Sequence, residues 1–283
     1  MKIGIGLPNP IPGTAGETLL QWAQRAEEAG FSSLATIDRI VYPSYESLIA
    51  LAAAAAATER IGLMTNVLLA PTRNPVLLAK EAASVDQLSG GRLTLGLGVG
   101  TREDDYTVLG LDFHTRGKRF DQDLELIHKA WSGERMGAGN PVGPRPVHGD
   151  RVPILMGGMS DKSIERTVKW AVGWTSGGAT PERAAPFAER VRKAWSEAGR
   201  EGVPRIAGLT YFGLSDRAVE AATEYLGDYY GDMGKQIAQN IPTSAQSLKD
   251  TVKKFEENGF DELFVDPTLA DLAEIERAAE AIL

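Results

Sequence analysis

Two patterns of apolar and polar positions, one strand-like and one helix-like, alternate along the whole chain. Short aliphatic and β-branched runs are typical of buried strands, and each precedes a longer stretch whose apolar residues recur every three or four positions, as on one face of a helix. Strands are predicted at 2–7, 33–37, 61–67, 93–97, 152–156, 173–176, 205–214 and 262–266. Helices are predicted at 17–29, 45–59, 75–88, 117–131, 161–171 and 181–198, twice between the last two strands, and at 271–283. The second of the two helices between the last strands is predicted to begin with a capping box at Thr243–Gln246.

This order predicts the fold class. Alternating strands and helices form parallel sheets, and eight such units in a chain of 283 residues favour a closed (β/α)8 TIM barrel of the α/β class. An open, doubly wound sheet is the alternative. Residues 133–151 are rich in glycine and proline, which predicts an irregular insertion before the fifth strand. No shift in composition marks a boundary, so residues 1–283 are expected to form a single domain.

The barrel places the candidate chemistry, because reactive groups lie at the carboxyl ends of barrel strands. Asp38 and Arg39 follow the second predicted strand, and Asn66 and Val67 end the third. Glycines dominate the ends of later strands: Gly98 and Gly100, then Gly157, Gly158 and Ser160, then Gly177 and Gly178. Glycine pairs that lead into helices predict a phosphate site, since the backbone can approach an anion closely and free N–H groups face it. The alternative is that they only form tight turns.

Composition narrows the classes of function. The formal net charge is −8 and no basic tract is present, which argues against nucleic acid as a partner. Cysteine is absent and only three histidines occur, so no metal site is expected. No apolar run reaches membrane-spanning length. The expectation is a soluble cytoplasmic protein without a membrane partner.

The inventory of acids and bases at the strand ends is small. His114 lies in the segment after the fourth strand and Arg39 after the second, and the two are the catalytic candidates. The glycines at 96, 98 and 100 do not form a dinucleotide fingerprint, because Glu103 occupies the position of its last glycine and no helix follows at once. A phosphate site with few acids and bases indicates that a bound cofactor supplies the chemistry.

Several motifs resemble those of the bacterial luciferase-like superfamily. They are Thr-Glu-Arg-Ile-Gly-Leu at 58–63, Pro-Thr-Arg-Asn-Pro-Val at 71–76, the long Ser-Gly-Gly-Arg block at 88–100, Arg-Glu-Asp-Asp-Tyr at 102–106, Arg-Gly-Lys-Arg-Phe at 116–120 and Pro-Ile-Leu-Met-Gly-Gly at 153–158. The resemblance covers most of the chain. It implies a (β/α)8 barrel, FMN or the deazaflavin F420 as coenzyme, and a homodimer; the small side chains at 52–57 are the predicted contact.

The resemblance also implies roles for the strand-end residues. Asp38 and Asn66 would face the edge of the flavin ring, with a cis peptide bond between Asn66 and Val67 behind it. The segment from Gly98 to Gly100 would lie beside the ring or the ribityl chain. The phosphate would be surrounded by Gly157, Gly158, Ser160, Gly177 and Gly178.

One departure limits the functional hypothesis. Many relatives have a histidine near Asp38 and Arg39, and this chain has none there. Arg39 would instead stabilise an anionic reduced flavin. The leading hypothesis is a monooxygenase that uses reduced FMN and O2 on a small organic substrate, with a flavin reductase supplying the FMN. The alternatives are an F420-dependent dehydrogenase or reductase and a non-catalytic flavin-binding barrel.

Overall fold

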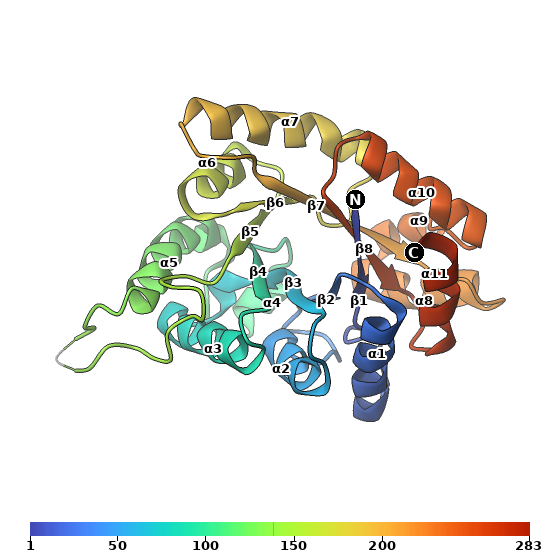
Figure 1. Cartoon of the computed structure of the whole chain (residues 1–283), viewed down its shortest axis with the longest axis horizontal. Helices are drawn as coiled ribbons and strands as arrows, with labels where there is room; N and C mark the ends of the chain where they lie inside the picture. Colours follow the sequence, from blue (N-terminus) through green and yellow to red (C-terminus); the bar gives the residue numbers. More distant parts are fainter. Residues whose placement is uncertain (138) are drawn as a thin grey trace.

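Eight parallel strands close into a barrel in the order of the chain (Figure 1). The computed structural model describes residues 1–137 and 139–283. The predicted (β/α)8 barrel is confirmed, and the open sheet is wrong because β1 pairs with β8. The strands are β1 Lys2–Gly6, β2 Ser33–Thr36, β3 Gly62–Leu69, β4 Leu93–Gly98, β5 Ile154–Gly157, β6 Gly173–Thr175, β7 Arg205–Phe212 and β8 Glu262–Pro267.

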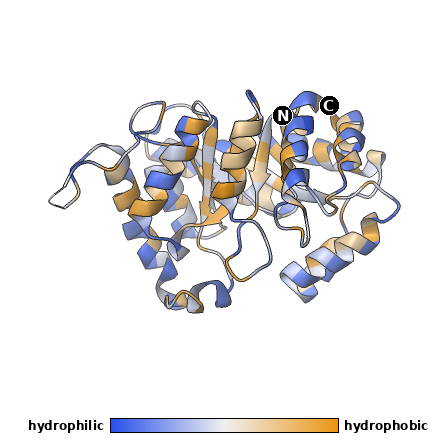
Figure 2. Cartoon of the chain, turned by 90° about the horizontal axis from the view of Figure 1, so that it is seen from below, coloured by the Kyte–Doolittle hydropathy of each residue, from blue (hydrophilic) through white to orange (hydrophobic). Residues whose placement is uncertain are grey.

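Helices surround the barrel. They are α1 Gly16–Ala29, α2 Ser47–Ala57, α3 Pro75–Leu88, α4 Asp104–Thr107, α5 Arg116–Trp131, α6 Asp161–Trp170, α7 Pro181–Glu197, α8 Ala218–Tyr230, α9 Asp232–Ala238, α10 Ala245–Glu257 and α11 Ala273–Ile282, with short 3-10 turns η1 Ala70–Thr72 and η2 Phe113–Thr115. Apolar stripes on the outer helices face the strands, and both termini lie at one end of the barrel (Figure 2).

Two local predictions need correction. Three helices, not two, separate β7 from β8, because Gly231 at a φ of 66° ends α8 and begins α9. Helix α10 begins with a capping box between Ser244 and Ser247, where the sequence pattern placed it between Thr243 and Gln246. Serine hydroxyls occupy both positions of the box, so the predicted box, which ended at Gln246, lay one residue too early.

The inside of the barrel is layered. Ala35, Met64, Leu155, Ala207 and Phe264 form its central apolar layer. Nearer the amino ends of the strands, Glu262 accepts hydrogen bonds from Ser32, Ser33 and Arg205. At the opposite end, near the carboxyl ends of the strands, the interior opens into a cavity.

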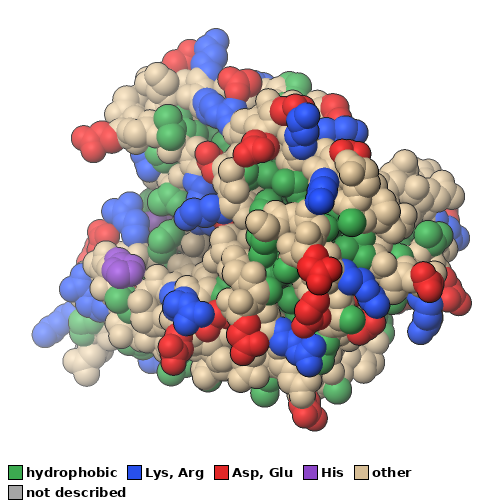
Figure 3. Space-filling view, turned by 45° about the vertical axis from the view of Figure 1, so that its right-hand side comes forward, with side chains coloured by type: hydrophobic (Ala, Val, Ile, Leu, Met, Phe, Trp, Pro, Cys, Tyr) green, Lys and Arg blue, Asp and Glu red, His purple; other side chains and the backbone are tan. Residues whose placement is uncertain are grey.

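The surface is mixed in charge, and the insertion packs against it. Acidic and basic side chains are interspersed over the face in Figure 3. The irregular segment before β5 lies on α3, where Lys80 and Gln87 donate to the carbonyls of Gly143 and Arg145. In the part of the chain that the structure describes, no helix is both long and apolar enough to span a bilayer.

Asp123 on α5 is expected to make the stability of the barrel depend on pH. Burial raises the pKa of its carboxyl to about 6, and Arg119 only partly opposes this. Between about pH 4 and pH 6 the folded chain therefore holds a proton that the unfolded chain releases, so the free energy of unfolding falls as the pH rises through this range. We expect Asp123→Asn to flatten that part of the profile in urea unfolding. Glu125→Gln, on the same helix but exposed, should keep the wild-type slope; an unchanged slope in Asp123→Asn would contradict the assignment.

Candidate active site

A cavity of about 190 Å³ lies at the carboxyl ends of the strands, where barrel enzymes carry their reactive groups. Ligand pockets usually measure about 300–1,000 Å³, so this cavity is smaller than a whole coenzyme requires. It contains seven of the predicted site residues: Asp38, Arg39, Asn66, Val67, Gly100, Gly177 and Gly178. The other lining residues are Ile37, Leu69, Thr101, Arg102, Asp105, Leu209, Tyr211, Tyr229 and Tyr230.

The Asp38 carboxylate is saturated by donors from the protein. Arg73 binds both of its oxygens, at 2.8 and 3.0 Å. The Ser47 hydroxyl donates to one oxygen at 3.3 Å and the Leu69 N–H to the other at 2.9 Å. Arg73 also donates to Glu46 at 2.8 Å. Asp38 therefore holds the end of β3 in place, and its main partner, Arg73, is one that no local sequence pattern indicates.

Arg39 does not pair with its neighbour Asp38. Its guanidinium contacts buried Asp105 at 2.8 Å and Asp104 at 3.2 Å, and lies over the ring of Tyr229. Asp105 also accepts the N–H groups of Ile40 and Val41, at 2.9 and 2.8 Å. One buried carboxylate thus orients both the side chain of Arg39 and the backbone that follows it.

Asn66 offers the cavity wall a buried donor without a partner. The peptide bond between Asn66 and Val67 is cis, which confirms the prediction, and the pairing of β3 with β4 shifts between Thr65 and Leu68. The Asn66 Oδ1 accepts from the Thr175 hydroxyl at 2.9 Å. Its Nδ2 is buried and has no acceptor among residues 1–137 and 139–283. Such a group is suited to a carbonyl or ring nitrogen of a ligand.

Two predicted glycines make room for Val67. A Cβ on Gly98 would lie 2.7 Å from one Val67 methyl, and a Cβ on Gly157 would lie 3.0 Å from the other. Neither glycine lines the cavity itself. They act from behind, because only residues without side chains leave space for Val67 to form the wall.

The junction between β5 and α6 lies outside the cavity lining. Gly158 has a φ of 94°, which favours glycine, and its carbonyl accepts from Trp174 at 2.7 Å. Ser160 caps α6 in a reciprocal pair with Ser163. The phosphate role of Gly157, Gly158 and Ser160 stays a prediction. His114 is exposed on η2 and does not line the cavity, so its catalytic role also stays a prediction.

Tyrosines form the wall opposite β3, and sequence reasoning missed them. The hydroxyls of Tyr211 and Tyr230 lie 2.7 Å apart. Burial raises the pKa of Tyr211 and Tyr229 well above the ordinary value, and burial raises that of Tyr230 despite the bond from Tyr211. Burial also holds the pKa of nearby Asp266 well above its usual range. Burial therefore disfavours negative charge on the tyrosines and on Asp266 at this side of the cavity. Adjacent tyrosines at 229 and 230 were the one signal available.

Comparisons with known proteins identify the family of this chain. The model of a family described as luciferase-like monooxygenase matches residues 1–247. The chain belongs to the luciferase-like monooxygenase family. The uncharacterised protein Rv0940c of Mycobacterium tuberculosis is 31% identical over 269 residues, covering 83% of this chain and 90% of that protein.

Two solved structures show the same fold at low identity. An F420-dependent secondary alcohol dehydrogenase, in complex with an F420–acetone adduct, is 19% identical with a TM-score of 0.80, and the match covers 99% of this chain and 98% of that one. The oxygenating constituent of 3,6-diketocamphane monooxygenase from Pseudomonas putida, in complex with FMN, is 18% identical with a TM-score of 0.77, covering 100% and 99%. Family membership supports an enzyme, and these two neighbours show the shared fold.

Proposed function

We propose that the protein is a cytoplasmic monooxygenase that uses reduced FMN and O2 to oxidise a small organic substrate. The observation that carries the proposal is the unpartnered Nδ2 of Asn66 beside the Val67 wall. Asn66 would donate to the polar edge of the flavin ring, and Val67 would support the ring from behind. The flavin supplies the reducing electrons when bound.

The remaining residues of the site would bind the coenzyme phosphate, stabilise charge on the ring and exclude water. Gly177 and Gly178 line the cavity, and with Gly157, Gly158 and Ser160 they would surround the phosphate, with Gly100 beside the ribityl chain. Arg39, oriented by Asp105, would stabilise negative charge on the ring without transferring a proton. Protonated tyrosines and apolar side chains exclude water from the opposite wall.

A second candidate function is an F420-dependent dehydrogenase or reductase. It is favoured by the F420-dependent neighbour, which covers 99% of this chain with a TM-score of 0.80. A non-catalytic flavin-binding barrel is a third. A flavin reductase would be a partner only in the FMN-dependent case, because a free-standing source of reduced FMN is then required.

Titration of the purified protein with each coenzyme separates the candidates. We expect FMN to bind saturably, as measured by absorption and fluorescence. We also expect the protein to consume oxygen when reduced FMN and a panel of small organic substrates are supplied. Saturable binding of F420 alone, with hydride transfer, would favour the second candidate. Flavin binding without turnover on any substrate would favour the third.

Gly158→Val tests the phosphate site. A side chain there meets the Ser163 hydroxyl, 2.9 Å from the position of a Cβ, and is strained by the φ of 94°. We expect at least tenfold weaker binding of FMN, the order of a lost charge-assisted contact, with riboflavin much less affected. Gly199→Val is the control, since that glycine has a φ of 66° but lies in an exposed turn. Equal FMN affinity in both variants would move the phosphate elsewhere.

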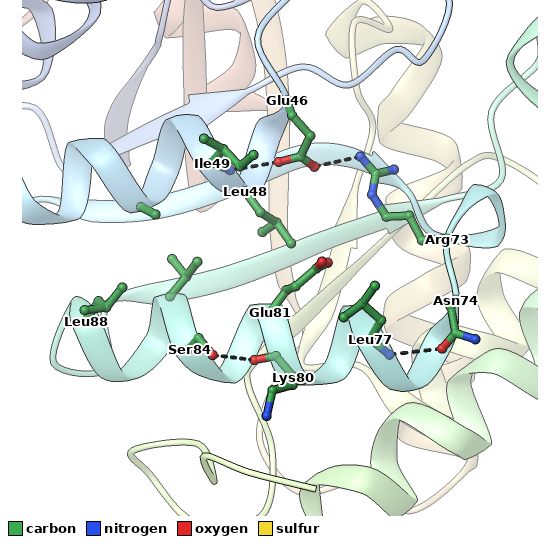
Figure 4. Close-up of a pocket in the computed structure, with 12 residues that line it drawn as sticks. Glu46, Leu48, Ile49, Arg73, Asn74, Leu77, Lys80, Glu81, Ser84 and Leu88 are labelled. Atoms are coloured by element: carbon green, nitrogen blue, oxygen red, sulfur yellow. Dashed lines mark hydrogen bonds and ion pairs between the residues drawn. The ribbon is translucent and has the colours of Figure 1, made fainter.

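An apolar groove between α2 and α3 supports the homodimer. It has a volume of about 540 Å³, and Figure 4 shows side chains of both helices pointing toward one another across it. Ile49, Leu77 and Leu88 are exposed at its sides by 70%, 52% and 69%. Charges of both signs occur there, on Glu46, Glu81, Lys80 and Arg73. Protruding apolar side chains beside a hollow suit the self-complementary face of a two-fold dimer.

The small side chains predicted for this contact divide between two faces. Ala54 and Ala55 are buried against the barrel, whereas Ala52 lines the groove. We expect light scattering at micromolar concentration to give the mass of a dimer, and Ile49→Glu combined with Leu77→Glu to give that of a monomer. Leu283→Glu, at an exposed residue remote from the groove, should leave the dimer intact. A monomeric wild type would remove the proposal.

A further inference from the structure

Arg102 is the one cavity-lining charge without an opposite partner in the part of the chain that the structure describes. Asp38 is matched by Arg73, and Arg39 is matched by Asp105. No ion pair of Arg102 with residues 1–137 or 139–283 is found. Arg102 therefore presents a guanidinium that no described carboxylate contacts, in a protein whose net charge is −8.

The protein orients the guanidinium of Arg102 but engages few of its hydrogen-bond donors. One terminal nitrogen donates to the carbonyl of Tyr229 at the end of α8. The group lies 5.9 Å from the ring centre of Tyr229 and 6.0 Å from that of Tyr230. A guanidinium has five N–H donors, and the described residues accept from one of its nitrogens only. The aromatic platform thus orients a fork whose other donors are available at the cavity wall.

The rest of the lining selects what such a fork would bind. Ile37, Leu69 and Leu209 are apolar, and Tyr211 and Tyr230 present aromatic surfaces whose hydroxyls bond to each other. A volume of about 190 Å³, shared with any ring held at Asn66 and Val67, limits the substrate to a small molecule. The fork of donors on a half-buried guanidinium recognises planar anions such as carboxylates, in two parallel hydrogen bonds.

We propose that Arg102 forms a substrate subsite for a carboxylate, and that the substrate class is a small aromatic acid. This rests on the proposed function for the reaction, but the subsite itself is a property of the cavity. The anion on Arg102 could alternatively be the phosphate of the coenzyme, because both are planar or tetrahedral oxyanions that a guanidinium binds. The experiment distinguishes the two sources.

The test compares benzoate with benzamide, which has the same shape but no charge, on wild-type protein, Arg102→Gln and Arg102→Lys. Binding is measured by calorimetry, with and without saturating FMN, and FMN and riboflavin affinities are measured for each variant. We expect Arg102→Gln to weaken benzoate roughly tenfold to a hundredfold, Arg102→Lys to retain part of the affinity, and benzamide to bind weakly and equally to all. FMN affinity should not change. Arg217→Gln, an exposed arginine paired with Glu220, is the control for charge.

Several outcomes would overturn the proposal. It fails if benzoate does not bind the wild type, or if benzoate and benzamide bind alike. It also fails if Arg102→Gln loses FMN but not riboflavin, because Arg102 would then hold the coenzyme phosphate. Thermal unfolding checks that each variant is folded, and loss of benzoate together with retained affinity in Arg102→Lys excludes misfolding. If neither FMN nor F420 binds while benzoate still depends on Arg102, the proposed function fails and the subsite stands.

Discussion

Arg73→Met is expected to lower the free energy of unfolding by about 3–5 kcal/mol, because it leaves the buried Asp38 carboxylate without its counter-charge. The side chain of Asp38 is 1% exposed, and both of its oxygens bind Arg73. Burial lowers the pKa of Arg73, but Asp38 and Glu46 more than offset this and raise it, so the guanidinium is charged at every accessible pH. Urea unfolding at pH 7 measures the loss.

A double-mutant cycle separates the lost pair from lost packing. Asp38→Asn in the Arg73→Met background removes the stranded charge, so the double variant should be more stable than Arg73→Met alone. Arg73→Lys keeps the charge but not the two-point contact, and we expect an intermediate loss. Arg60→Met, whose side chain is 72% exposed, should change stability by less than about 0.5 kcal/mol. A loss of that small size in Arg73→Met would show that the pair contributes nothing net.

The same ion pair connects two surfaces of the protein. Arg73 lines the groove between α2 and α3, while its partner Asp38 lines the barrel cavity. Through the Leu69 N–H, the carboxylate also holds the end of β3. The residues proposed for the dimer contact are thus connected by one ion pair, between Arg73 and Asp38, to the residues proposed for the flavin ring.

The fold could be predicted because each strand–helix unit carries its own signal. Pro75 marks the start of α3 and Gly30 the end of α1, so local rules locate these elements without knowledge of the tertiary structure. The strand ends followed from the barrel, which is why Asp38, Asn66 and Gly177 were correctly expected to lie together. The order of strands and helices can be predicted from local patterns, and in a barrel that order brings the strand ends together.

The partners of those residues could not be predicted in the same way. Asp38 is 35 positions from Arg73, and Arg39 is 66 from Asp105, and neither spacing follows a helical or strand period. Two tyrosines of the wall, Tyr229 and Tyr230, come from the end of α8, and the third, Tyr211, comes from β7. Such contacts arise only when separate loops meet above the barrel, and no local pattern records that meeting.

Gly98→Ala is expected to weaken coenzyme binding by at least tenfold by pushing Val67 into the cavity. The added methyl group would lie 2.7 Å from a Val67 methyl, and a β-branched side chain has few other rotamers to adopt. Overpacking of this kind costs about 1–3 kcal/mol, so the barrel should stay folded while its wall shifts. Fluorescence titration with FMN measures the effect.

Val67→Ala supplies the matched rescue, because it removes the methyl that a Cβ at residue 98 would meet. If steric displacement of Val67 is the cause, Gly98→Ala combined with Val67→Ala should bind FMN more tightly than Gly98→Ala alone, although Val67→Ala by itself removes part of the wall. Gly16→Ala is the control for a glycine change as such, since its Cβ would meet only the Tyr45 hydroxyl at 3.8 Å. Equal affinities for the single and double variants would mean that Gly98 touches the coenzyme directly. The ring would then lie against β4 rather than against Val67.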